Sequence, residues 1–237
     1  MSQILYQLDN DSLAFPSDEF ALSDPNGLLA VGGDLSSKRL LNAYSQGIFP
    51  WFNEGDPIMW WSPTPRAIIK TSDIKINKTL SKAIRRAPYT ITINKCFEQV
   101  NQLCANAPFR QEETWIVPLM QQAYLSLHQL GYAHSVEVWL DKELVGGLYG
   151  VAINGFFSGE SMFYSKSNAS KFALVALVQL LKSNGIKFID CQIINKFLAN
   201  MGAIEVDRNI FKGQLHESIQ QTVNDDIWTA RELIIEL

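Results

Sequence analysis

The order of apolar and polar residues between positions 156 and 192 predicts a strand, a helix and a second strand. Residues 156–163 are apolar and aromatic, and they follow Asn154-Gly155, a pair typical of hairpin turns. Apolar residues then recur at helical spacing from 169 to 182. A glycine ends this helix, and a short strand is predicted over 187–191.

Three polar side chains stand out in this unit. Glu160 lies among aromatic residues, where a carboxylate is costly to bury without a partner. Asp190 and Gln192 are two residues apart, so we expect them to share one face at the carboxyl end of the second strand. Ligands of α/β sheets tend to bind at that end. Either acid alone is more simply a structural carboxylate, but two acids and an amide together favour a functional site.

The remaining pattern predicts an α/β (α+β) fold. Helices are expected over 38–46, 78–86, 97–105, 117–130 and 195–200, and strands over 67–76, 89–93, 134–140, 143–153 and 204–206. From 135 to 206 the order is strand, strand, strand, helix, strand, helix, strand, which is compatible with the GNAT arrangement of acyltransferases. Glycines at 146, 147 and 150 indicate a bulge or the close approach of a ligand.

An aromatic, proline-bearing stretch separates the N-terminal part from the rest. It holds three tryptophans within eleven residues, Trp51, Trp60 and Trp61. Such a stretch forms either the wall of a pocket or domain seam, or a loop pinned onto the core. Pro63-Thr64-Pro65 is the predicted boundary between a small N-terminal domain, 1–64, and a larger domain, 65–237.

Composition narrows the class of protein. The 237 residues contain no apolar run long enough to span a membrane, and residues 1–5 lack the charged and apolar regions of a secretory signal, so we expect neither feature. Three widely spaced cysteines favour reduced thiols in the cytoplasm, and no Cys/His spacing resembles a metal site. Cys191 is a conceivable nucleophile, but we expect it to face away from Asp190, so a small buried apolar side chain is the better interpretation.

Charge is distributed unevenly along the chain. The net charge is −4, yet residues 66–95 hold eight cations and one acid, or +7, which leaves −11 for the rest. A basic segment on an acidic protein indicates a polyanion partner, although a solvated helix face explains the charge about equally well. Lys78, Lys82, Arg85 and Arg86 recur at spacings of three and four, which places them largely on one helical face.

Several long motifs resemble one family. They are Gly47-Ile48-Phe49-Pro50-Trp51-Phe52, Trp60-Trp61-Ser62-Pro63 with Pro65-Arg66, Thr114-Trp115-Ile116, His134-Ser135-Val136-Glu137-Val138-Trp139, Gly159-Glu160-Ser161-Met162-Phe163, Ala169-Ser170-Lys171 and Ile189-Asp190-Cys191-Gln192. In this order, from about Phe15 to Gly202, they resemble the bacterial leucyl/phenylalanyl-tRNA–protein transferases.

That resemblance implies a GNAT-like larger domain and a specific reaction. Leucine, phenylalanine and, less well, methionine would pass from aminoacyl-tRNA to proteins with N-terminal Lys or Arg, creating a degradation signal of the N-end rule. It implies no cofactor and no metal, and we expect a monomer. It places catalysis at Asp190, Gln192 and Glu160. Because the rest of the chain is acidic, we expect the basic helix face to meet the tRNA backbone. The donor pocket would be walled by Trp51, Trp115, Leu148, Phe157, Leu174, Leu177 and Ile189.

Two other functions compete with this interpretation. An acyl-CoA-dependent N-acetyltransferase of the same fold usually carries a glycine-rich loop before the helix, whereas residues 164–168 contain no glycine. A non-catalytic RNA-binding module would use the basic segment. The acid–amide cluster argues against that module, because carboxylates beside a phosphate site repel the ligand.

Overall fold

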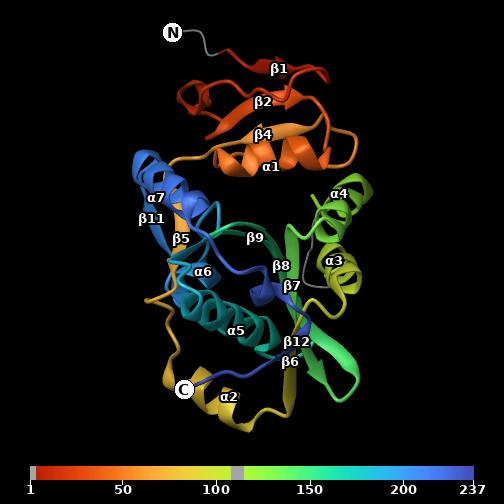
Figure 1. Cartoon of the computed structure of the whole chain (residues 1–237), viewed down its shortest axis with the longest axis vertical. Coiled ribbons are helices and arrows are strands. Elements are labelled where there is room, and N and C mark those ends of the chain that lie inside the picture. The colour runs from red at the N-terminus through yellow and green to blue at the C-terminus, as the bar shows by residue number, and fades with distance from the viewer. Residues whose placement is uncertain (1–3, 108–114) are drawn as a thin grey trace.

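The computed structural model describes residues 4–107 and 115–237, so Thr114 of the motif Thr114-Trp115-Ile116 lies outside it. Its strands form two sheets, one of four strands in the order β1-β2-β4-β3 and one of eight in the order β11-β5-β10-β9-β8-β7-β6-β12. Figure 1 shows the small sheet at one end of the molecule and the large sheet with its helices at the other. The predicted mixed α/β fold with a small N-terminal unit is confirmed.

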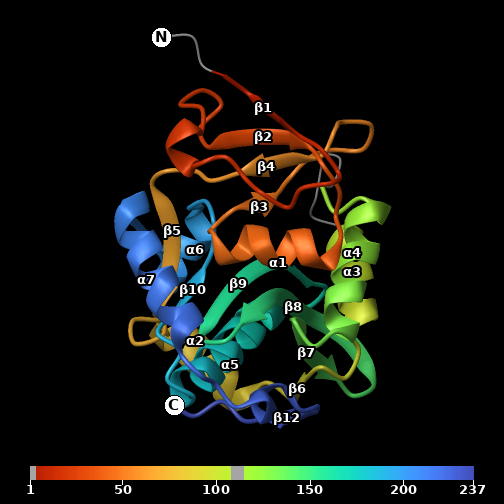
Figure 2. The same cartoon turned by 45° about the horizontal axis from the view of Figure 1, so that its top comes forward.

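The N-terminal unit consists of the small sheet and one helix. Its elements are β1 Tyr6–Leu8, the 3-10 helix Asp18–Phe20, β2 Leu28–Gly32, α1 Ser37–Ser45, β3 Phe49–Pro50 and β4 Met59–Trp61. Helix α1 lies between the small sheet and the larger unit, where it contacts α4 and α7 (Figure 2). The two units are therefore connected by the packing of α1 as well as by the covalent link between β4 and β5.

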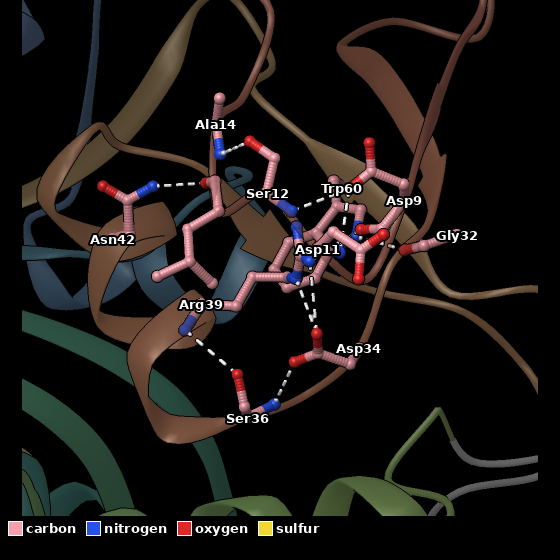
Figure 3. Close-up of polar contacts among 11 residues, drawn as sticks. Asp9, Asp11, Ser12, Ala14, Gly32, Asp34, Ser36, Arg39, Asn42 and Trp60 are labelled. Carbon is pink, nitrogen blue, oxygen red and sulfur yellow. Dashed lines mark hydrogen bonds and ion pairs between the residues drawn. The ribbon is translucent and has the colours of Figure 1, made fainter.

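A buried arginine holds the N-terminal unit together (Figure 3). The side chain of Arg39 is fully buried, and its Nε and Nη2 each donate to Oδ2 of Asp34 at 3.2 Å. Nη2 also donates to the carbonyl oxygen of Asp9 at 2.7 Å. Gly33 has a φ of +71°, and a Cβ there would come within 3.1 Å of the guanidinium. The turn Gly32-Gly33-Asp34 thus leaves room for the Arg39 guanidinium and supplies its carboxylate partner.

The larger unit contains the remaining elements. They are β5 Arg66–Lys70, α2 Lys78–Arg86, β6 Tyr89–Ile93, α3 Phe97–Ala105, α4 Pro118–Gln129, β7 Ala133–Leu140, β8 Glu143–Ile153, β9 Phe156–Tyr164, α5 Ala169–Ser183, β10 Phe188–Asp190, α6 Lys196–Met201, β11 Ile204–Val206, α7 Arg208–Gln220, the 3-10 helix Asp225–Trp228 and β12 Arg231–Leu233. The predicted order from β7 to β11 is confirmed. The strand predicted over 67–76 is wrong in length, because the chain turns after Lys70.

One pairing of the large sheet sets the position of the site. β9 and β10 run parallel, with Ile189 opposite Phe157 and Asp190 opposite Ser158. A parallel pair needs a crossover, which α5 supplies on one face of the sheet, while α3 and α4 cover the other face (Figures 1 and 2). Residues far apart in the sequence are thereby brought to adjacent positions.

The two units share a hydrophobic core. Leu40 and Tyr44 of α1 belong to the same buried cluster as Val100 of α3 and Tyr124 of α4. The chain crosses from the small sheet to the large one between β4 and β5, which is where the boundary at 64/65 was predicted. The position of a domain boundary stays a prediction, since the packing is continuous across the link.

At the glycines of β8, other segments of the protein approach so closely that a Cβ would collide with them. A Cβ at Gly150 would lie 2.2 Å from the carbonyl oxygen of Ser158, and one at Gly146 would lie 2.5 Å from the Cβ of Ala169. The pairing with β9 shifts register between Tyr149 and Gly150. At this shift the extra residue is Glu160 of β9, whereas the predicted bulge of β8 is at Val145, where the pairing with β7 shifts register between Val138 and Trp139. The close approach at these glycines is that of β9 and α5. Across the described ranges, no helix is both long and apolar enough to cross a membrane.

Candidate active site

A cavity of about 660 Å³ opens beside β9, β10 and the N-terminus of α5. That volume lies within the range of sites for small ligands. The cavity is bordered by residues of β3, β8, β9, α5 and α6 and by the loops around Trp115 and 191–195. Its lining comprises Phe49, Pro50, Trp51, Trp115, Leu148, Tyr149, Gly159, Glu160, Ser161, Met162, Tyr164, Ser170, Leu174, Leu177, Ile189, Cys191, Gln192, Ile193, Ile194, Asn195, Phe197 and Leu198.

Most residues expected to wall the donor pocket do line this cavity. They are Trp51, Trp115, Leu148, Leu174, Leu177 and Ile189. Phe157 is not among the lining residues. It is fully buried and its ring stacks 5.6 Å from that of Trp228, on the 3-10 helix 225–228. The strand therefore brings Phe157 into the core beneath the cavity.

Trp51 lies at the mouth of the cavity. Its side chain is 40% exposed although it is large and apolar. The ring of Trp61 lies 5.5 Å away, and the Trp61 Nε1 donates to the carbonyl oxygen of Trp51 at 2.7 Å. Two alternatives were open for the aromatic stretch, a pocket wall and a loop pinned onto the core. Trp51 is part of a pocket wall, whereas Trp60 is fully buried in the core.

Asp190 is paired with an arginine. The Nε and Nη2 of Arg66 donate to its two carboxylate oxygens at 2.8 and 2.7 Å, and both side chains are buried. The guanidinium lies 4.8 Å from the ring of Phe49 and 4.6 Å from that of Phe211. Arg66 therefore contributes no exposed charge to the basic segment, and Asp190 presents no free carboxylate to a substrate.

The expected shared face of Asp190 and Gln192 is wrong. β10 ends at Asp190, and Gln192 has a φ of +56°, so the alternation of a strand does not continue. The two residues are linked in another way, since the backbone N–H of Gln192 donates to Oδ1 of Asp190 at 3.0 Å. Asp190 thus fixes the turn that carries Gln192. The same turn brings Cys191 to the cavity wall, whereas Asp190 is not among the lining residues.

The Cys191 thiol is chemically unreactive in this setting. Burial raises its pKa well above the usual value, and the charge of Asp190 raises it further. Its Sγ lies 3.7 Å from the carbonyl oxygen of Ile189. The thiolate is the nucleophilic form, so this cysteine acts as a small side chain of the wall.

A chain of hydrogen bonds connects Gln192 with Glu160. Gln192 Nε2 donates to Oγ of Ser158 at 2.8 Å, and that hydroxyl donates to Glu160 Oε1 at 2.9 Å. Tyr124 donates to Glu160 Oε2 at 2.7 Å. The hydroxyl of Tyr44 lies 2.7 Å from that of Tyr124, whose proton is already committed, so Tyr44 is the donor. The network extends from α1 of the N-terminal unit to the turn after β10.

Glu160 titrates close to neutral pH. Burial raises its pKa to about 7, and the charge of Asp190 acts in the same direction. Hydrogen bonds from Tyr124 and Ser158 oppose this shift by stabilising the charged form. A carboxyl with such a pKa on the wall of a cavity is typical of functional sites.

Sequence reasoning missed four members of this site: Arg66, Ser158, Tyr124 and Tyr44. A buried acid on a short apolar strand requires a cation, and Arg66 directly precedes another apolar strand segment, 67–69. The sequence thus indicates that a cation is needed, but the pairing of β5 with β10 decides which one. The tyrosines occupy ordinary core positions of helices, and nothing in their spacing distinguishes them.

The four cations predicted to bind tRNA lie on α2. Lys78, Lys82, Arg85 and Arg86 are all exposed, and Leu80 is the buried residue of this helix. In the described part of the chain, none of the four is recorded in an ion pair. They are absent from the cavity lining, so any role in binding would be separate from the chemistry.

The chain thus combines a mixed α/β fold with an apolar cavity beside an acid–amide network, and comparison with known proteins gives its class, that of the acyl-group transferases. Family models described as leucyl/phenylalanyl-tRNA protein transferase and its N-terminal domain match residues 68–216 and 33–64. The chain belongs to the leucyl/phenylalanyl-tRNA–protein transferase family. Its predicted enzyme class, an aminoacyltransferase, and transfer of leucine or phenylalanine from tRNA to protein are confirmed.

Relatives with this name match along their whole length. The protein of Colwellia psychrerythraea is 62% identical over 99% of this chain and 100% of its own. That of Shewanella halifaxensis is 52% identical over 100% of both chains, and that of Pseudoalteromonas atlantica is 50% identical over 97% of both.

Similarity to solved structures is more distant. L-PGS from Bacillus licheniformis covers 70% of this chain and 53% of its own with a TM-score of 0.40 and 15% identity. A GCN5-related N-acetyltransferase from Kribbella flavida covers 74% and 63% with a TM-score of 0.40 and 11% identity. Similarity at this level supports no further conclusion.

Proposed function

We propose that the cavity receives the side chain of leucine, phenylalanine or, less well, methionine on aminoacyl-tRNA. The acceptor is the α-amine of a protein that begins with Lys or Arg, and the product carries a degradation signal of the N-end rule. The observation that carries this proposal is the apolar cavity with Glu160 and Gln192 on its wall.

Selection of the donor rests on apolar contacts. Leu148, Leu174, Leu177 and Ile189 supply aliphatic surface to the cavity, and Met162 adds an adaptable side chain. One methylene in such a pocket changes binding by about 1–3 kcal/mol. Size alone therefore discriminates weakly, which suits a site that accepts several side chains unbranched at Cβ and rejects β-branched ones by shape.

The reaction needs no external activation, because the donor is an ester. The acceptor nitrogen attacks the ester carbonyl, a C–N bond forms and the C–O bond to the ribose breaks. The proton lost by the amine passes to the departing ribose oxygen. An α-amine has a pKa of about 7.7–8.0, so a useful fraction is neutral near pH 7. A strong base is unnecessary, and alignment of the amine is the main requirement.

The three polar residues have different roles in this proposal. Gln192 aligns the attacking amine. Asp190, whose charge is matched by Arg66, holds the backbone of Gln192 in place. Glu160 is the carboxylate of the cavity wall without a cationic partner among the described residues, so it attracts the positive side chain of the acceptor. Asp190 is therefore not assigned the role of accepting the proton that the attacking amine loses.

The partners follow from the same reaction. The exposed cations of α2 give tRNA a surface for phosphate contacts, which supply affinity without reading sequence. We propose that the enzyme works as a monomer in the cytoplasm, where aminoacyl-tRNA is made. Neither a cofactor nor a metal is required by this scheme.

A transfer assay tests the proposal. Labelled Leu-tRNA is mixed with peptides that begin with Arg, Lys or Ala, and labelled peptide is measured. Label on the Arg and Lys peptides alone is expected, and equal label on all three would contradict the acceptor specificity. Gln192→Ala should lose most transfer while filter binding of the tRNA stays nearly normal, and Asp190→Ala should do the same for its folded fraction, since it leaves Arg66 without a counter-charge. Binding without turnover by the unaltered protein would instead favour an RNA-binding module.

A further inference from the structure

We propose that Ser158 is a positioning residue of the transfer reaction, whose hydroxyl sets the orientation of the Gln192 carboxamide. This inference rests on the proposed role of Gln192. Ser158 lies in β9, directly opposite Asp190 of β10, and is fully buried. Its Oγ accepts from Gln192 Nε2 at 2.8 Å and donates to Glu160 Oε1 at 2.9 Å.

The count of protons fixes which way the carboxamide points. A serine hydroxyl carries one hydrogen, and an ionised carboxylate can only accept. Above a pH of about 7, where Glu160 is mainly ionised, the hydrogen of Ser158 is therefore given to Glu160, and the lone pairs of Oγ face Gln192. Only the NH₂ group of the carboxamide can bond there. The Gln192 oxygen is consequently on the opposite side of the planar group, available to accept an N–H from the attacking amine.

Little else restrains this side chain. Gln192 lies beyond the end of β10 with a left-handed backbone, and Asp190 holds only its N–H. Within the described residues, the bond to Ser158 is the hydrogen bond recorded for the carboxamide. Without it, the group can turn and present its donor where an acceptor is needed. A small misplacement of an aligning group can slow a reaction by a factor of about 100.

Ser158 also affects the carboxylate on its other side. Glu160 receives hydrogen bonds from Ser158 and Tyr124, and Tyr44 stands behind Tyr124. Asp190 is the other charged group that acts on it, and Arg66 pairs with that aspartate. Removing a donor from the ionised form raises a carboxyl pKa. Loss of the hydroxyl should therefore move the acid limb of the pH profile to higher pH, an effect that simple loss of packing would not produce.

The structure offers a matched control. Ser135 of β7 is also fully buried, and its Oγ donates to Glu137 two residues further on at 2.5 Å, as Ser158 does to Glu160. Neither Ser135 nor Glu137 lines the cavity. Ser158→Ala and Ser135→Ala thus remove the same atom from the same kind of hydrogen bond, and only the first should affect transfer.

The experiment measures kcat, the KM for Leu-tRNA and the pH profile of kcat/KM with an Arg-starting peptide. Ser158→Ala should lower kcat about tenfold, leave KM within about twofold and move the acid limb upward. Ser135→Ala should match the unaltered enzyme in all three. Ser158→Cys keeps a weak donor of similar size and should give an intermediate kcat. Ser158→Ala behaving like Ser135→Ala would overturn the inference.

A double variant separates this inference from the proposed function. Gln192→Ala with normal transfer would refute the proposed role of Gln192. If Gln192→Ala is slow, Ser158→Ala/Gln192→Ala should be no slower at pH values above the acid limb, because Ser158 there acts through the group already removed. A further loss of about tenfold in the double variant would overturn the inference. Should Ser158→Ala fail to fold, Ser158→Cys carries the same comparison, and a normal kcat and pH profile for it would refute the positioning role.

Discussion

Arg66 and Asp190 form a buried ion pair across 124 residues of sequence, with two hydrogen bonds of 2.8 and 2.7 Å. The pair stands where β5 lies beside β10, and the rings of Phe49 and Phe211 cover the guanidinium. Both charges are withdrawn from solvent, so each depends on the other. Asp190 is thus a structural support for the turn that carries Gln192.

Removal of Arg66 should destabilise the protein. Arg66→Ala leaves Asp190 buried without a counter-charge, which costs about 3–5 kcal/mol of unfolding free energy in comparable cases. Transfer should fall together with stability. Urea unfolding measures the effect, and Lys187→Ala is the control, because its pair with Glu217 at 3.5 Å is largely exposed and should contribute less than about 1 kcal/mol. Similar unfolding curves for both variants would refute the importance of the buried pair.

Trp51 and Phe157 should respond differently to truncation. Trp51→Ala removes a half-exposed ring from the mouth of the cavity and should alter the ranking of Leu-, Phe- and Val-tRNA as donors at near-normal stability. Phe157→Ala empties a core position and should cost about 3–5 kcal/mol while the donor ranking of the folded fraction stays unchanged. Ranking assays with urea unfolding distinguish the two outcomes. A changed ranking for Phe157→Ala alone would mean that Phe157 reaches the donor.

Local pattern was sufficient for most elements. The spans 78–86, 89–93 and 97–105 agree with α2, β6 and α3 at every residue, because each has its own periodicity and clear ends. Asn77, for example, caps α2 by accepting from the backbone N–H of Leu80. The cluster of Glu160, Asp190 and Gln192 was also found from sequence, since unpaired polar groups in apolar strands are conspicuous. These features depend on neighbours in the sequence.

Features that depend on distant partners were not predictable in this way. The partner of Asp190 is set by the pairing of β5 with β10, which no local pattern encodes. The direction of Gln192 depends on a left-handed residue after β10, where two-residue alternation no longer applies. The placement of Phe157 depends on packing against Trp228, near the C-terminal end. Each of these three features is fixed by packing or pairing that the local sequence does not specify.

Glu160 should make stability depend on pH. Its pKa in the folded protein, about 7, is higher than the 4.5 of the free side chain. A group with a raised pKa contributes most stability below its unfolded value, and the contribution is lost as pH rises through the folded value. Glu160→Gln cannot ionise. The free energy of unfolding of this variant, minus that of the unaltered protein, should therefore be larger at about pH 8 than at about pH 5. Urea unfolding at the two pH values measures this difference.

The control for that comparison is Glu217→Gln, because Glu217 is 71% exposed. Its effect on unfolding free energy should be nearly the same at both pH values. An equal shift in the two variants would show that Glu160 does not titrate in this range. Activity gives a second check, since the acid limb of Glu160→Gln should reflect only the acceptor amine.

The last prediction concerns the exposed cations of α2. Lys82→Glu/Arg86→Glu should raise the KM for aminoacyl-tRNA and flatten its salt dependence by about one unit of slope for each phosphate that the variant no longer binds. A minimal aminoacyl-adenosine donor should react normally, since it lacks the phosphates of the tRNA body and α2 is not part of the cavity lining. Lys142→Glu/Lys182→Glu changes the net charge equally at exposed positions off α2 and should leave KM and slope near normal. Equal effects of the two double variants would mean that overall charge draws tRNA to the protein. No effect of either would mean that α2 is only a solvated face and that tRNA docks elsewhere.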